Sequence, residues 1–146
     1  MINDTSTTSL LVVAHGSRRQ ASNDEIRCLA RRMGASDGQR YREVRCAFLE
    51  LAEPSIPDGI QECIDAGAQR VVVMPYFLSA GRHVAEDIPN EVAVKRSEHP
   101  ELDIVIAPYL GEAESMVALM LDQASRGIDA EALRDSPVAA EAGGGR

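Results

Sequence analysis

The sequence alternates four candidate strands with four stretches of helical spacing, and this alternation limits the possible folds more than any other feature. The clearest strand is residues 71–74, a run of Val71, Val72, Val73 and Met74 that is closed by Pro75. A continuous apolar run of this length is typical of a strand buried on both faces of a parallel sheet. By similar reasoning, further strands are expected at residues 10–14, 43–49 and 102–107.

Four helices are expected between and after these strands. Ser22 and Glu25 have the spacing of a capping box for the first helix, which could also begin one turn earlier, and Gly34 is placed to end it. Asp87 is placed to cap the third helix, whose first turn tolerates Pro89. The expected helices cover residues 22–34, 55–66, 87–96 and 112–126, the last with Met116, Val117, Leu119, Met120 and Leu121 buried and Gly127 at its end.

A β–α unit repeated four times predicts an α/β fold with three layers, α/β/α. Its centre would be a four-stranded parallel sheet with right-handed crossovers and flavodoxin-like winding. The length of 146 residues suits a single domain, which we expect at residues 1–127. Residues 128–146 are rich in Ala, Glu and Gly and are expected to form a weak final helix or a disordered tail.

Composition excludes several classes of function. The net charge of -8 disfavours nucleic acid as a partner, because phosphate binding needs a basic face. No apolar run approaches the roughly 20 residues of a membrane span, and the N-terminus lacks a secretory signal, so a cytoplasmic protein is expected. Cys28, Cys46 and Cys63 form no CxxC pair and are expected to be small buried hydrophobic residues in a reducing compartment.

Polar side chains follow three of the predicted strands. His15 follows the first strand, Glu50 follows the second, and His83 lies in the loop after the third. The carboxyl ends of parallel strands meet at one edge of a sheet, where open α/β sheets bind their ligands. Imidazole and carboxylate together suit Co, Ni, Fe or Zn, so a divalent-metal site is one interpretation. The alternative is that each is a structural or solvated residue. His99, before Pro100, is expected to be only a solvated loop residue.

Other residues near this edge have both a functional and a structural interpretation. Arg18, Arg19 and Arg82 could bind carboxylates or only keep the surface soluble. Glu53 could support the site or only lead into the second helix, and Gly81 could allow a ligand to approach or only form a turn. The glycine-containing loops match neither a P-loop nor GxGxxG, which disfavours a nucleotide-binding flavodoxin-like domain.

Three segments together resemble one family. They are VVAHGSR after the first strand, FLELAEPSIPDGI after the second and VVVMPYFLSAGRHVAEDIP after the third. Across residues 10–127 they resemble the short form of the sirohydrochlorin chelatase family, the CbiX type of class II chelatase. The resemblance implies a chelatase-like fold and a lyase that inserts a divalent metal into the tetrapyrrole sirohydrochlorin. Cobalt is the leading candidate, iron and nickel are alternatives, and no organic cofactor is implied.

The resemblance also implies roles for individual residues. His15 and His83 would ligate the metal with help from Glu50, and His15 would accept a proton. The implied tetrapyrrole-binding residues are Glu53, Leu78, Ser79, Ala80, Gly81, Arg82 and His83. A chain this short is similar to relatives that dimerise, so a homodimer is expected. The rival interpretation is a non-catalytic metal- or tetrapyrrole-binding protein of the same fold.

Overall fold

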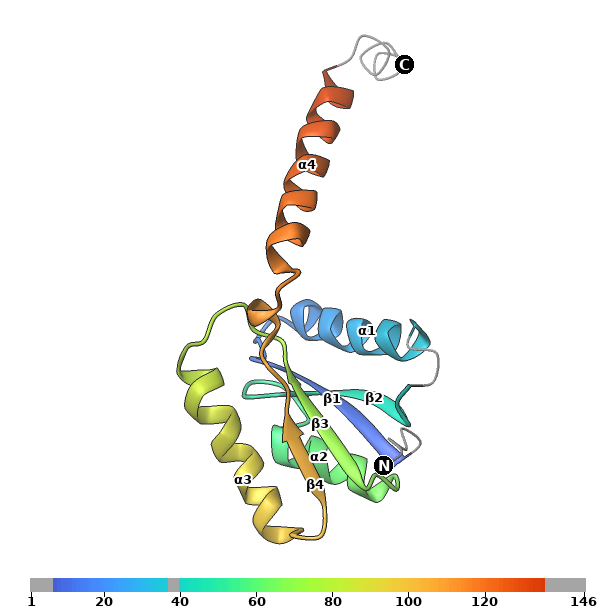
Figure 1. Ribbon diagram of the computed structural model, residues 1–146, viewed down its shortest axis with the longest axis vertical. Coiled ribbons are helices and arrows are strands. Elements are labelled where there is room, and N and C mark those ends of the chain that lie inside the picture. The colour runs from blue at the N-terminus through green and yellow to red at the C-terminus, as the bar shows by residue number, and fades with distance from the viewer. Residues whose placement is uncertain (1–6, 37–39, 136–146) are drawn as a thin grey trace. The chain divides into compact units, whose positions relative to one another are not determined.

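The structure, a computed structural model, describes residues 7–36 and 40–135. The chain forms two compact units, Met1–Glu112 and Ala113–Arg146. The first unit contains all the strands of the described part and the first three α-helices (Figure 1). The second unit contains the long helix α4.

The first unit is built on one four-stranded sheet. Its strands are β1 (Thr8–Ala14), β2 (Glu43–Phe48), β3 (Arg70–Pro75) and β4 (Asp103–Ile106). All pairings are parallel, and the strand order is β2-β1-β3-β4. The chain therefore winds outward from β1 first to one side and then to the other, and the winding reverses between β1 and β3. Such a reversal opens a crevice at the carboxyl ends of the two central strands.

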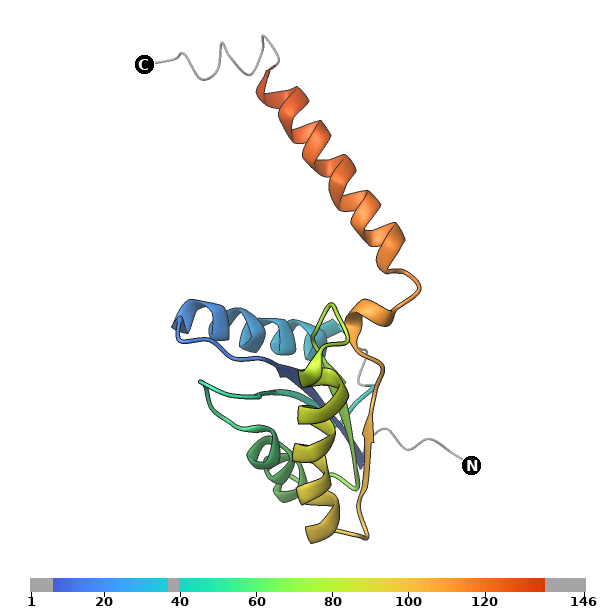
Figure 2. The ribbon, with the colours of Figure 1, turned by 90° about the vertical axis from the view of Figure 1, so that its left-hand side faces the viewer.

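Helices cover both faces of this sheet, which confirms the expected three-layer α/β/α fold. Helix α1 (Gln20–Ser36) lies on one face, and α2 (Ile56–Asp65) and α3 (Ile88–Glu98) lie on the other (Figures 1 and 2). Successive side chains of β1 point alternately to the two faces of the sheet. Leu11 and Val13 belong to the main core cluster beneath α2 and α3, whereas the intervening Leu10 is on the α1 side with Met33.

The first residues of the helices agree with the sequence prediction in α2 but not in α1. Helix α2 begins as expected, because the Ser55 side chain accepts a hydrogen bond from the Asp58 backbone N–H at 3.2 Å. The capping box expected at Ser22 is wrong, because α1 already begins at Gln20 and Ser22 lies inside its first turn. The preceding turn is closed locally, with the Arg19 backbone N–H donating to Ser17 Oγ at 3.0 Å.

The third helix, α3, starts within one residue of the expected position, but an unexpected helical turn precedes it. Residues His83–Asp87 form a π-helical turn, η2, that runs directly into α3. The Ile88 backbone N–H donates to the His83 carbonyl and closes the wide turn. Asp87 consequently has helical backbone angles, φ −67° and ψ −47°, and makes no capping hydrogen bond. Its predicted role as a helix cap is therefore wrong.

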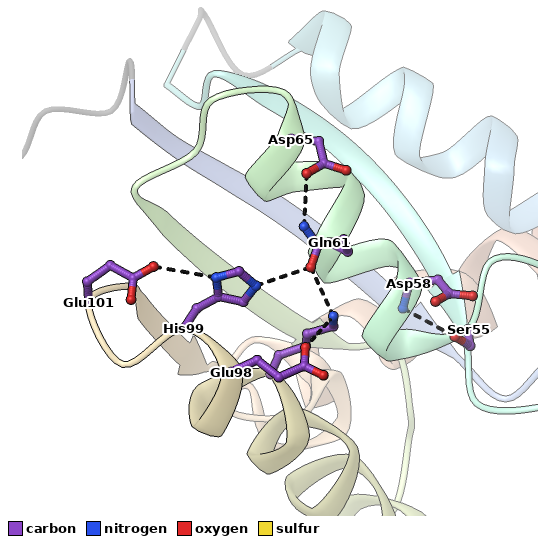
Figure 3. Close-up of polar contacts among 8 residues, drawn as sticks. Ser55, Asp58, Gln61, Asp65, Glu98, His99 and Glu101 are labelled. Atoms are coloured by element: carbon purple, nitrogen blue, oxygen red, sulfur yellow. Dashed lines mark hydrogen bonds and ion pairs between the residues drawn. The ribbon is translucent and has the colours of Figure 1, made fainter.

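A polar network joins α2 to α3 at the end of the sheet opposite the crevice (Figure 3). Gln61 is its centre. Its amide oxygen accepts from Lys95 Nζ at 2.9 Å and lies 3.2 Å from His99 Nε2, and its amide nitrogen donates to Asp65 at 2.8 Å. His99, which was expected to be solvated, has a side chain only 25% exposed. The backbone turn between α3 and β4 places it against Gln61, 38 residues earlier in the chain.

The second unit is described from Ala113 to Asp135, and its helix α4 spans Met116–Arg134. None of the residues of α4 is buried, so the expected burial of Met116, Val117, Leu119, Met120 and Leu121 is wrong. Gly127 lies inside the helix rather than at its end. Apolar spacing predicts a helix but not a partner for its apolar face. Beyond the expected end, the exposed i,i+3 pair of Glu131 and Arg134 lies on the continuing helix.

The expected tail falls partly in this helix. Residues 128–134 continue α4 as regular helix, and residues 136–146 lie outside the described part. Within the described ranges, no helix is long and apolar enough to span a membrane.

Candidate functional site

The loops after β1 and β2 stay paired beyond the sheet. The Leu49 backbone N–H donates to the Ala14 carbonyl at 2.9 Å, and the Glu50 N–H donates to the His15 carbonyl at 3.0 Å. Gly16 has a φ of +95°, and a Cβ at this position would overlap the Glu50 carbonyl oxygen. Only glycine satisfies both requirements. This close approach brings His15 Nε2 to 3.4 Å from Glu50 Oε1.

The hydrogen bond on the other ring nitrogen decides the tautomer of His15. Its Nδ1 lies 2.8 Å from the Gly16 carbonyl oxygen, which can only accept. Nδ1 therefore carries a proton, and Nε2 of the neutral ring has a lone pair. That lone pair faces the Glu50 carboxylate, which is also an acceptor when ionised. Two acceptors placed in this way are suited to share a cation, either a proton or a metal ion.

His83 lies beside this pair because β3 is the neighbour of β1. The rings of His15 and His83 meet edge to face with centroids 4.8 Å apart, and Phe77 lies on another side of His83 at 6.3 Å. Nδ1 of His83 is 2.8 Å from Asp87 Oδ2. The structure thus brings together the three side chains that the sequence analysis placed at one sheet edge.

The three side chains do not form a closed metal-binding cage. No group of three or more His, Cys, Asp or Glu side chains in residues 7–36 and 40–135 is arranged to hold a metal ion. The side chains of His15, Glu50 and His83 are 41%, 56% and 44% exposed. The site is therefore open to solvent, and a cation could enter and leave it without unfolding the loops.

A crevice of about 680 Å³ adjoins His15. Its two walls are a face of α1 and the segment after β3. Ile26, Leu29 and Arg32 contribute to the wall from α1, and Tyr76, Phe77 and Leu78 form the wall after β3. Apolar walls with a few polar groups are typical of sites for organic ligands. The crevice could hold part of a flat ligand next to the imidazole of His15.

The remaining predicted site residues are not all at this crevice. Leu78 lines it, and residues 79–82 are exposed on the loop that follows. Arg82 is 79% exposed, and its Nε is 3.8 Å from a carboxylate oxygen of Glu86. Glu53 lies in a separate acidic hollow along α2 with Asp58.

The three cysteines have different environments, so the expectation that all are buried is wrong. Cys63 is fully buried, and burial raises the pKa of its thiol to about 12. Cys46 is half-buried, which raises its thiol pKa in the same direction. Cys28 is exposed and lines the crevice from α1.

Two residues that support the site were missed in the sequence. Asn23 is buried on α1 and holds the loop after β1 in place: its Oδ1 accepts from the Ser17 N–H at 2.9 Å, and its Nδ2 donates to the Ser17 carbonyl at 2.8 Å. The available signal was a polar residue three positions before Ile26 on the apolar face of a helix. Asp87 was missed because residue 83 was assigned to a loop, which hid the i,i+4 spacing of His83 and Asp87.

Comparison with known proteins identifies the family of this chain. The family model CbiX matches residues 9–127. The chain belongs to the CbiX family. Among curated CbiX relatives, the chloroplastic sirohydrochlorin ferrochelatase of Arabidopsis thaliana is 37% identical over 114 residues, which are 78% of this chain and 50% of that protein. The sirohydrochlorin cobaltochelatase of Methanococcus maripaludis is 37% identical over 86 residues, 59% of this chain and 58% of that protein. The chain spans about half the length of the curated relatives it matches.

Solved structures show the same fold. The sirohydrochlorin chelatase SirB from Bacillus subtilis subspecies spizizenii, in complex with cobalt, matches with a TM-score of 0.71 and 29% identity, covering 82% of this chain and 50% of that one. A CbiX protein from Marinobacter aquaeolei, described as a cobalamin biosynthesis protein, matches with a TM-score of 0.66 and 28% identity over 88% of this chain and 99% of that one. The resemblance seen in the sequence is therefore confirmed at the level of family and fold.

Proposed function

We propose that the protein is a sirohydrochlorin metallochelatase, a lyase that inserts a divalent metal ion into the tetrapyrrole. The observation that carries this proposal is the facing pair of His15 Nε2 and Glu50 Oε1, 3.4 Å apart, with the ring of His83 beside them. The names of the CbiX relatives, which are sirohydrochlorin ferrochelatases and cobaltochelatases, support it.

The chemistry of metal insertion matches these groups. Insertion replaces the water on the cation with four ring nitrogens and releases two pyrrole N–H protons. A neutral imidazole can accept such a proton, and we assign this role to His15. His15, His83 and Glu50 would first hold the cation through nitrogen and oxygen ligands, which suit Co²⁺, Fe²⁺ and Ni²⁺. Nε2 of His15 would accept the proton only after the cation has left it for the ring nitrogens. An open set of this kind can pass its metal on to the macrocycle.

The tetrapyrrole would bind over the crevice beside His15. Leu78 and its neighbours Tyr76 and Phe77 offer an apolar wall for the ring, and residues 79–82 form the adjoining exposed loop. Sirohydrochlorin is a polycarboxylate, which a chain of net charge -8 does not attract as a whole. Local guanidinium groups would have to bind its carboxylates, and Arg82 on this loop is well exposed for that purpose.

The proposal is tested by incubating the purified protein with sirohydrochlorin and Co²⁺ and following the absorption change against the spontaneous rate. His15→Ala and His83→Ala should each remove most of the protein-dependent rate. His99→Ala is the matched control, because this histidine lies at the other end of the sheet and should leave the rate near that of the wild type. Near-normal turnover in either site variant would contradict the shared site.

The same assay separates the enzyme from its rival, a non-catalytic metal- or tetrapyrrole-binding protein. An enzyme metallates many equivalents of sirohydrochlorin per chain, whereas a binding protein stops at a stoichiometric amount. Competition among Co²⁺, Fe²⁺ and Ni²⁺ under the same conditions would then identify the preferred metal, since nitrogen and oxygen ligands accept all three.

A further inference from the structure

We propose that Asp87 is a positioning residue for His83: it holds the proton on Nδ1 and so presents the Nε2 lone pair for metal binding. The proposal rests on the metal-binding role proposed for His83. Asp87 does not itself reach the metal or the tetrapyrrole in this proposal; it acts through the imidazole.

The contact between the two side chains is short and is built into the backbone. His83 Nδ1 lies 2.8 Å from Asp87 Oδ2. Both residues belong to the π-helical turn η2, which the Ile88 N–H closes onto the His83 carbonyl. Ile88 and Val92 follow in α3 and are fully buried, so the turn is anchored directly in the core. π-Helical turns within helices occur frequently at functional sites.

Hydrogen-bond chemistry fixes the direction of this contact. An ionised carboxylate can only accept, so Nδ1 must be the donor and Nε2 of the neutral ring has the lone pair. A carboxylate on the far nitrogen of a metal-binding histidine also orients the ring and increases its basicity as a ligand.

The neighbouring histidine reaches the same state by a different route. His15 donates its Nδ1 proton to the Gly16 carbonyl at 2.8 Å, which again leaves Nε2 with the lone pair. Two different acceptors, the Gly16 carbonyl and the Asp87 carboxylate in η2, thus favour the same tautomer in two adjacent rings.

The turn also provides a matched control for the charge of Asp87. Glu86 is the adjacent residue and also has a carboxylate, but the structure pairs it with Arg82, at 3.8 Å. Glu86→Gln removes one negative charge from the same turn and leaves the contact between His83 and Asp87 in place. If Asp87 does more than contribute negative charge, Asp87→Ala must weaken Co²⁺ binding more than Glu86→Gln does.

The experiment measures Co²⁺ binding by visible absorption, without tetrapyrrole, for the wild type, Asp87→Ala, Asp87→Asn and Glu86→Gln. We expect Asp87→Ala to weaken Co²⁺ binding by about 10- to 100-fold. Asp87→Asn should bind more tightly than Asp87→Ala, because an amide oxygen can still accept from Nδ1, and Glu86→Gln should stay within about twofold of the wild type. In turnover assays, Asp87→Ala should leave the KM for sirohydrochlorin unchanged. ¹⁵N NMR of the neutral His83 ring should show the proton on Nδ1 in the wild type but not in Asp87→Ala.

Three results would overturn the proposal: equal Co²⁺ affinity in Asp87→Ala and the wild type, an equally large loss in Glu86→Gln, or a wild-type His83 with its proton on Nε2. A wild-type protein that binds no Co²⁺ would overturn it together with the metal site. If the wild type binds Co²⁺ but does not metallate sirohydrochlorin, the proposed function fails while the role of Asp87 is still decided by the binding data.

Discussion

At the scale of single residues, Asn23 links helix α1 to the loop that carries His15. Asn23→Ala would remove both hydrogen bonds to the Ser17 backbone and leave its N–H and carbonyl without these partners. We expect a loss of about 1–3 kcal/mol in the free energy of unfolding, measured with urea, and slower metallation because His15 is held less firmly. Gln20→Ala is the control, since the Gln20 amide donates to the exposed Asp24 within the same helix. Equal stability of the two variants would contradict the proposed role of Asn23.

The buried thiol of Cys63 gives the folded state a dependence on alkaline pH. Burial raises its pKa from 9.0 to about 12, so the folded chain holds this proton more tightly than the unfolded chain does. The stability that this supplies is complete below about pH 9 and is lost as the pH rises towards 12. The free energy of unfolding should fall across this window by up to about 1.4 kcal/mol per pH unit. Urea titrations should show a smaller fall in Cys63→Ala; identical slopes would count against this account.

The sequence predicted the positions of the site residues but not their protonation. His15, Glu50 and His83 could be placed at one edge because the strands of a parallel sheet all have their carboxyl ends at the same edge. The partners of Nδ1 could not be predicted in the same way. One is the carbonyl of Gly16, whose direction depends on a positive φ, and the other is Asp87, whose approach depends on a π-helical turn that apolar spacing does not indicate.

At the scale of elements, two helical glycines should respond in opposite ways to the same change. A Cβ at Gly59 in α2 would lie 2.8 Å from the Cβ of buried Ala47, whereas one at Gly127 in α4 would meet nothing within 4 Å. Gly59→Ala should destabilise the first unit, since overpacking costs about 1–3 kcal/mol and outweighs the better helix propensity. Gly127→Ala should stabilise α4 by up to about 1 kcal/mol. Amide hydrogen exchange, resolved by residue, measures both, and slower exchange in α2 of Gly59→Ala would refute the packing argument.

A helix or strand was predicted correctly where local sequence spacing determines it, and incorrectly where tertiary packing does. The strands and the range of α2 were predicted closely because local sequence patterns determine them. Helix α4 was predicted to exist but wrongly expected to be buried. Its apolar residues have helical spacing, yet spacing contains no information about what covers a helix face.

At the scale of the whole molecule, charge and size limit how this chain could bind sirohydrochlorin. The chain carries a net charge of -8, and its ligand in the proposed reaction is also an anion. Long-range electrostatic repulsion between the chain and the ligand therefore opposes binding, and short-range contacts must supply the affinity. The crevice of about 680 Å³ beside His15 is open on the solvent side, so one copy covers only part of a large flat macrocycle.

A second copy of the chain could cover the rest, and we predict a symmetric homodimer with two crevices facing one cleft. Light scattering should give the mass of two chains at micromolar concentration. If both copies contact one macrocycle, metallation per chain should fall on dilution below the dissociation constant of the dimer, and the KM for sirohydrochlorin should rise at the same point. The matched measurement is Co²⁺ binding, which uses His15, Glu50 and His83 of one chain and should not change on dilution. A monomer that retains full activity per chain would show that a single crevice is sufficient.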